Sequence, residues 1–151
     1  MMVKRETDYA IRTVLYLAMQ PAGTHTTARA LAREKLIPPA LARRIVSRLT
    51  TAGILHSARG PSGGIALARP PAEITLLQVM RAVEGAPVVS PCVVEPASCP
   101  LMPECPVHEV WVDLQRSLET TLEHITFDQL AQRGLSLSQL PDPIFHCPEL
   151  S

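Results

Sequence analysis

A glycine-rich segment, Gly60-Pro-Ser-Gly-Gly64, lies between two short β-prone runs at 54–59 and 65–69. Two such runs separated by glycine and proline are typical of a β-hairpin. Three segments with the apolar spacing of amphipathic helices, at 7–20, 26–36 and 37–54, come before it. Three helices followed by a hairpin is the order of a winged helix-turn-helix, and this order constrains the fold more than any other feature of the chain.

The third helical segment is the predicted recognition helix, which such a fold places in the DNA major groove. Pro39 suits its first turn, where a missing amide costs nothing, and Gly53 suits its end. Leu41, Ile45, Val46 and Leu49 form its predicted buried stripe, so polar and basic side chains lie outside. With the wing, they make up the predicted DNA-binding set: Arg43, Arg44, Ser47, Arg48, Arg59, Gly60, Ser62 and Gly63.

The charge pattern supports a polyanionic partner. The chain has 14 Lys or Arg and 14 Asp or Glu, so its formal net charge is zero. Residues 1–70, however, hold eleven basic and three acidic residues, a charge of +8, and residues 71–151 hold the reverse, −8. A basic half of this size is typical of a nucleic-acid binder. The alternatives are solvated charges segregated by chance and a winged helix used only for protein contacts.

The segment 86–107, which we call the thiol loop, is rich in proline and contains Cys92, Cys99 and Cys105, with His108 just after it. A structural zinc site usually has a pair of cysteines two to four residues apart, which this loop lacks. Proline disfavours a buried regular element, although three inert buried cysteines remain an alternative. Spaced thiolates in a stiff loop favour an iron–sulfur cluster, 2Fe–2S or 4Fe–4S. Cys147, near the end of the chain, is predicted to be a bystander.

A fourth helix is predicted at 74–85, and a long one begins near Val107. Apolar residues recur along the long helix at spacings of four, three, four, four and three: Val107, Trp111, Leu114, Leu118, Leu122 and Ile125. This narrow stripe is typical of a coiled-coil-like seam, so we expect a homodimer, with packing on the chain's own domain as the alternative. The expected fold is mainly α-helical with a small β-hairpin wing and a long dimerisation helix. It divides into 1–85 (winged helix-turn-helix), 86–107 (cluster loop), 108–132 (dimerisation helix and following segment) and 133–151 (flexible tail).

The stretches TDYAIRTVLYLA, LARRIVSRLTTAGIL and SARGPSGGIALARP resemble the BadM/Rrf-two family of bacterial transcription regulators, over about residues 1–132. Their most specific part is Arg-Gly-x-x-Gly-Gly at 59–64, followed by Leu-Ala-Arg at 67–69. The resemblance implies a symmetric dimer and, in cluster-bearing members, a cysteine triad between the fourth helix and the dimer helix. The chain departs from the pattern at Ile65, where an aromatic residue is common, and in its first cysteine gap of six residues instead of five.

The resemblance also suggests two fourth ligands. His108 matches the histidine of the 2Fe–2S biogenesis regulator, and Asp8 aligns with the aspartate that ligates, across the dimer, the 4Fe–4S cluster of the nitric-oxide sensor. Each also has an ordinary structural interpretation, His108 as a surface side chain and Asp8 as a charge that favours a helix N-terminus.

The sequence therefore predicts a homodimeric regulator that binds a double-stranded DNA operator, and we expect it to be a repressor. Its affinity is expected to depend on a cluster that senses nitric oxide, redox state or iron status. The alternatives are a cluster-free regulator that senses thiol oxidation or a partner protein, and a small iron–sulfur electron-transfer protein. An enzyme is not expected, because no hydrolytic Ser/His/Asp set or phosphate loop is visible. The absence of a long apolar run and of a secretory signal predicts a cytoplasmic protein that does not enter a membrane.

Overall fold

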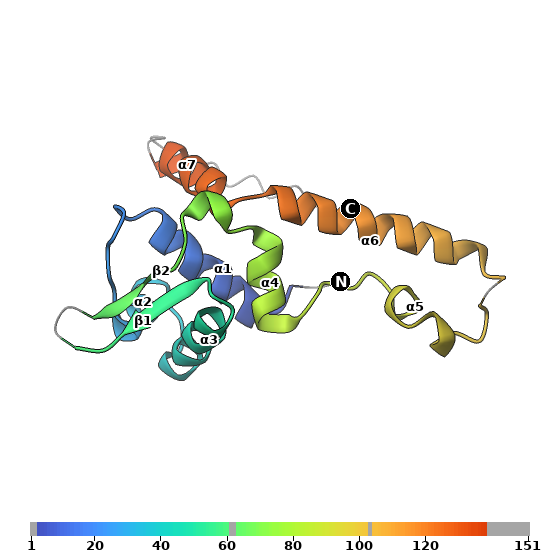
Figure 1. The fold of residues 1–151 in the computed structure, drawn as a ribbon, viewed down its shortest axis with the longest axis horizontal. Helices are drawn as coiled ribbons and strands as arrows, with labels where there is room; N and C mark the ends of the chain where they lie inside the picture. Colours follow the sequence, from blue (N-terminus) through green and yellow to red (C-terminus); the bar gives the residue numbers. More distant parts are fainter. Residues whose placement is uncertain (1–2, 61–62, 103, 139–151) are drawn as a thin grey trace.

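The structure, a computed structural model, describes residues 3–60, 63–102 and 104–138. Its helices and strands follow in the order α1 (Arg5–Ala18), α2 (Ala28–Glu34), α3 (Pro39–Thr51), β1 (Leu55–Ala58), β2 (Gly64–Leu67), η1 (Pro71–Glu73), α4 (Leu76–Glu84), α5 (Pro91–Val94), η2 (Pro96–Ser98), α6 (Pro106–His124) and α7 (Phe127–Ser138). Figure 1 shows that α1 to α4, the hairpin and α7 form one body, which we call the head, and that α6 projects from it.

The winged helix-turn-helix predicted from the sequence is confirmed. Strands β1 and β2 pair antiparallel, with Leu55 opposite Leu67 and Ala58 opposite Gly64. Gly64 has a φ of +142°, which L side chains rarely adopt. A Cβ at Gly63 would collide with the carbonyl oxygen of Ala58, so the wing requires glycine at both positions.

The core of the head is built from aliphatic side chains of α1, α2, α3, α4 and the hairpin. Helix α4 begins with a capping box, in which the Thr75 hydroxyl accepts from the Gln78 amide and the Gln78 side chain accepts from the Thr75 amide. Phe127 of α7 is fully buried in this core, although it follows α6 in the chain. The fully buried aliphatic core residues, all at most 1% exposed, are Ala10, Val14, Leu31, Ile45, Leu49, Ile54, Ile74 and Val79.

Helix α6 returns the chain from the far end of the molecule to the head (Figure 1). Two backbone hydrogen bonds join its C-terminal end to the start of α4. The Leu76 amide donates to the Ile125 carbonyl at 2.8 Å, and the Phe127 amide donates to the Ile74 carbonyl at 2.9 Å. The part of the thiol loop that contains α5 and η2, and the first turn of α6, therefore lie at the end most distant from the recognition helix (Figure 1). Among the described residues, no helix is both long and apolar enough to span a bilayer.

Three local expectations differ from the structure. Helix α1 starts at Arg5, because Lys4 has the extended backbone of an N-cap, and Thr7 lies buried inside the helix. The tail expected from residue 133 is helical as far as Ser138, since α7 packs on the head and continues past its buried residues. The thiol loop, expected to be irregular, contains the single helical turns α5 and η2.

Candidate functional site

Arg43 is the recognition-helix arginine that faces solvent without a partner. Its side chain is exposed, and it makes no hydrogen bond or ion pair within the part of the chain that the structure describes. It lines a groove of about 400 Å³ together with Thr27 at the start of α2 and Gly60 and Gly63 at the wing. A guanidinium in this position is free to pair with a phosphate or with a guanine edge.

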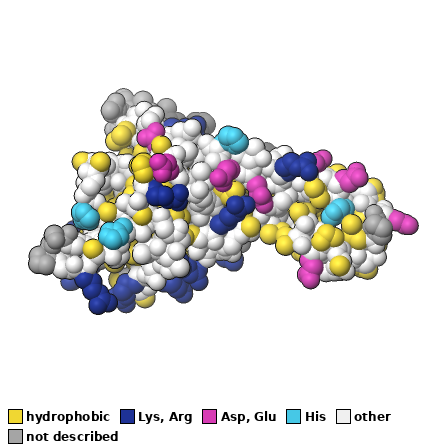
Figure 2. Space-filling model, in the orientation of Figure 1, with side chains coloured by type: hydrophobic (Ala, Val, Ile, Leu, Met, Phe, Trp, Pro, Cys, Tyr) yellow, Lys and Arg dark blue, Asp and Glu magenta, His cyan; other side chains and the backbone are white. Residues whose placement is uncertain are grey.

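Other cations extend this basic face. Figure 2 shows Lys and Arg side chains gathered along one edge of the head, where Figure 1 places α2, α3 and the hairpin. Arg59 in the wing and Arg29 on α2 are exposed, and neither has an ion pair with a described residue. Arg33, also on α2, forms its one ion pair to a described residue with its neighbour Glu34, at 3.6 Å. Sequence reasoning missed Arg29, although its place on the outer face of the helix before the recognition helix was a usable signal.

Arg44 and Arg48, predicted beside Arg43, have partners inside the protein. The Arg44 guanidinium donates from Nε to Glu6 Oε1 at 2.9 Å and from Nη2 to Glu6 Oε2 at 2.8 Å. Arg48 Nη1 lies 3.2 Å from Glu6 Oε1 and donates to the Val83 carbonyl at 2.6 Å. Ser47 is exposed on the same helix. Ser62 lies outside the described residues.

The cysteines of the thiol loop are free and half-buried. Cys92 Sγ lies 3.3 Å from the Ser90 hydroxyl, and Cys99 and Cys105 are likewise free thiols. His108 Nδ1 is buried without a hydrogen-bond partner. No group of three or more His, Cys, Asp or Glu side chains within residues 3–60, 63–102 and 104–138 is arranged to hold a metal ion. The predicted cysteines thus share one loop but do not converge on one point.

Asp8 lies in the head, on α1, and pairs with Arg12 at 2.7 Å. Figure 1 shows α1 in the head and the thiol loop at the far end of α6, so Asp8 and the cysteines of one chain do not meet. Cys147, interpreted as a bystander, lies outside the described residues.

Polar contacts join the start of the thiol loop to α6 and α4. Gln115 is buried, and its side chain accepts from the Val89 amide at 2.9 Å and donates to the Pro87 carbonyl at 2.7 Å. It also donates to Glu119, at 2.7 Å, and Glu119 contacts Arg81 of α4 at 3.4 Å. The loop is therefore connected to α4, and α4 contacts α3.

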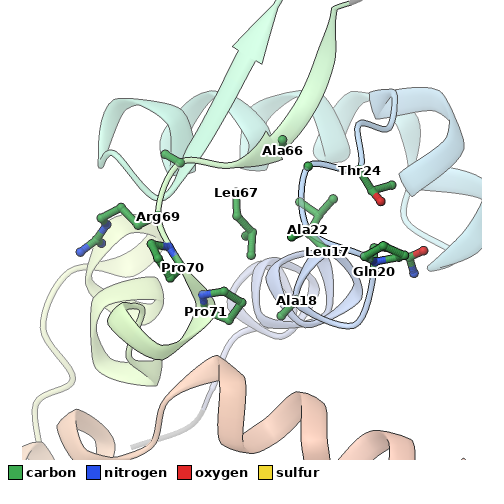
Figure 3. Close-up of a pocket in the computed structure, with 13 residues that line it drawn as sticks. Leu17, Ala18, Gln20, Ala22, Thr24, Ala66, Leu67, Arg69, Pro70 and Pro71 are labelled. Atoms are coloured by element: carbon green, nitrogen blue, oxygen red, sulfur yellow. The ribbon is translucent and has the colours of Figure 1, made fainter.

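A second cavity, of about 490 Å³, lies between the end of α1, the following turn, β2 and η1 (Figure 3). Leu67 lies in its middle, Ala18 lies at its edge on α1, and Arg69 points away from it. Arg69 Nη2 donates to Gln78 at 3.1 Å and Nη1 to the Glu73 carbonyl at 3.2 Å. No other titratable side chain lines this cavity, so it has no acid–base pair for catalysis.

Comparison with known proteins identifies relatives along most of the chain. The Rrf2 family, described as an iron-dependent transcriptional regulator, matches residues 3–133. A Mycobacterium tuberculosis protein named as an HTH-type transcriptional regulator, Rv1287, is 32% identical over 145 residues, covering 94% of this chain and 89% of the relative. A Haemophilus influenzae protein named in the same way is 28% identical over 125 residues, which is 83% of each chain.

Solved structures of other proteins have the same fold as this chain. CymR of B. subtilis, the global cysteine regulator, superposes with a TM-score of 0.71 at 24% identity, covering 88% of this chain and 98% of CymR. T. potens IscR gives 0.69 at 22% identity, covering 94% and 93%. At these identities the solved structures show the shared fold alone. The matched family and the Mycobacterium relative establish which family the chain belongs to. The chain is a member of the Rrf2 family of DNA-binding transcriptional regulators and not an enzyme.

Proposed function

We propose that the basic face of the head binds operator DNA, with α3 in the major groove and the hairpin against the sugar–phosphate backbone. The observation that carries this assignment is Arg43, a guanidinium that has no partner among the described residues and lines the groove between the recognition helix and the wing. Arg29 and Arg59 extend the face on either side, and both are suited to phosphate contacts. Ser47, Gly60 and Gly63 complete the proposed contact set among the described residues.

The protein acts, in this proposal, as a homodimer that pairs through α6. Val107, Val110 and Leu114 are about half exposed on this helix, at 45%, 53% and 47%. Figure 2 shows hydrophobic side chains gathered over the same distal part of the molecule. An apolar stripe of this kind on a protruding helix is suited to a second copy of the chain. Trp111 and Leu118, from the stripe predicted by sequence, are half-buried within the single chain.

Cys92, Cys99 and Cys105 are proposed to hold an iron–sulfur cluster, which would provide a centre that reacts with oxidants and nitric oxide. Three thiols in a proline-stiffened loop are the soft donors that such a cluster requires. The buried, unpartnered Nδ1 of His108 lies three residues after Cys105 and is a suitable fourth donor. Asp8 is an alternative donor only across the dimer, since within one chain it lies in the head. The description of the family as iron-dependent supports the proposal.

The donor types fit a cluster, whereas their arrangement in the single chain does not bring them together. The same observation favours a second candidate, a cluster-free regulator of this family that senses oxidation of its thiols. In both versions, Gln115 and the Arg81–Glu119 contact connect the thiol loop to α4 and thereby to the recognition helix.

Anaerobic purification followed by iron and sulfide counting and an absorbance spectrum separates the two candidates. We expect a coloured protein with acid-labile sulfide, and we expect Cys99→Ala to lose both while remaining folded. The control is His56→Ala, which removes a potential ligand from the exposed side of β1. Colourless wild-type protein from iron-replete cells would favour the cluster-free regulator. Full cluster content in Cys99→Ala would remove Cys99 from the ligand set.

A further inference from the structure

Glu6 occupies an unusual position, because one carboxylate binds two arginines of the recognition helix. Both of its oxygens accept from Arg44, at 2.9 and 2.8 Å, and Oε1 also lies 3.2 Å from Arg48. The bidentate geometry with Arg44 is the strongest form of carboxylate–guanidinium contact. Glu6 lies 38 positions from Arg44 in the sequence, so only the fold brings it to the recognition helix.

The exposures of the three side chains show how they are arranged. The Glu6 side chain is 19% exposed, whereas Arg44 and Arg48 are 58% and 42% exposed. The carboxylate therefore lies behind the arginines, partly withdrawn from water and salt, where its attraction for them is screened less than at an open surface. Arg48 is held a second time, by the Val83 carbonyl at 2.6 Å.

From this geometry we infer that Glu6 holds Arg44 and Arg48 away from DNA and leaves Arg43 as the recognition-helix cation that contacts it. This inference rests on the DNA binding proposed above. A phosphate that approached Arg44 would have to displace a carboxylate that already satisfies its Nε and Nη2 donors, and would be repelled by that carboxylate. Each arginine held in this way makes one phosphate contact fewer, so fewer counterions are released from the DNA when the protein binds.

The consequence is greater sequence discrimination. Phosphate contacts strengthen binding to every sequence equally, whereas base contacts distinguish sequences. A recognition helix that offered three free arginines would bind any duplex tightly, and competing genomic sites would retain it. Glu6 is thus a specificity-determining residue that does not itself touch DNA.

The test compares Glu6→Gln with the wild-type full-length protein by fluorescence anisotropy on a labelled duplex of random sequence, over a range of salt concentrations. The substitution removes the charge and keeps the size of the side chain. We expect tighter non-specific binding and a slope of log affinity against log salt that is steeper by up to about two units, because each released arginine adds about 0.9. Asp113→Asn is the matched control: it changes the net charge equally, but the ion pair that Asp113 makes among the described residues is with Arg116 on α6.

Arg44→Ala is examined in both backgrounds. We expect it to leave the slope unchanged in the wild type, where Arg44 is withheld, and to lower it by about one unit in Glu6→Gln. This arm remains informative even if Glu6→Gln fails to fold. A lowered slope for Arg44→Ala in the wild type, or a Glu6→Gln protein that binds no more tightly than Asp113→Asn, would overturn the inference. If the wild-type protein binds no duplex at all, the proposed DNA binding fails instead.

Discussion

Neighbouring arginines on one helix have different surroundings in this protein. Arg43, Arg44 and Arg48 share the outer side of α3, and all three are exposed. Glu6 binds the second and third, whereas the first has no partner among the described residues. Exposure alone therefore does not identify the cations available to a ligand, and the intramolecular partners of each one have to be considered.

At this scale we predict that Arg43→Ala weakens DNA binding. The loss of one guanidinium contact should lower affinity by about tenfold and reduce the salt slope by about one unit. Anisotropy titrations at several salt concentrations measure both quantities. Arg116→Ala on α6, which removes an exposed arginine paired with Asp113, should leave them unchanged. Equal effects of the two substitutions would mean that only net charge matters.

Sequence reasoning identified residues whose role is local and missed those whose role depends on distant partners. The fourth helix was expected at 74–85, and its start depends on a local contact, in which the Thr75 hydroxyl accepts from the Gln78 amide. Glu6 was not noticed, because its partner Arg44 is 38 positions away. Leu36, 84% exposed with a φ of +53° between α2 and α3, is another such case, since a left-handed leucine has no local sequence signature.

At the scale of elements, Gln115 is the side chain that ties the thiol loop to α6. Its amide satisfies the Val89 amide and the Pro87 carbonyl, two backbone groups of the loop. A backbone amide or carbonyl that is shielded from water and loses its hydrogen-bond partner lowers the stability of the folded state. The loop therefore depends on α6 for its position as much as on its own prolines.

We predict that Gln115→Ala lowers the free energy of unfolding by about 1–3 kcal/mol, because it leaves both backbone groups without their partner. Urea denaturation followed by circular dichroism, at a fixed protein concentration, measures the change. Gln132→Ala is the control, because within the described part of the chain the Gln132 side chain makes a single, exposed hydrogen bond, to Asp128. A difference of less than a few tenths of a kcal/mol between the two variants would contradict the assigned role.

The helices of the head were predictable because caps and apolar periodicity define them locally. Helix α7 was not predictable, because it buries Phe127 and packs on α1 and η1, which lie more than fifty residues earlier in the chain. The candidate DNA face was predictable as a set of residues, but which of its cations are free was not. The cysteines of the thiol loop were identified by spacing, and their arrangement around a common ligand stays a prediction.

For the whole molecule, the dimer is the arrangement that would cover the exposed stripe of α6. We predict that Leu114→Glu shifts the protein from dimer to monomer in sedimentation velocity, because a carboxylate would be buried opposite apolar side chains of the second copy. Leu36→Glu, which places the same charge at an exposed leucine on the head, should remain dimeric. A wild-type protein that sediments as a monomer at micromolar concentration would refute the dimer.

Two backbone hydrogen bonds, between Leu76 and Ile125 and between Phe127 and Ile74, fix the C-terminal end of α6 to the start of α4. A helix of 19 residues is about 28 Å long, at about 1.5 Å per residue, so the first turn of α6 lies about that far from these bonds. A tilt of α6 by about ten degrees about its C-terminal end would therefore move its first turn by about 5 Å. The same tilt would act on α4 through these bonds, and the Val83 carbonyl, one residue before the end of α4, accepts from Arg48.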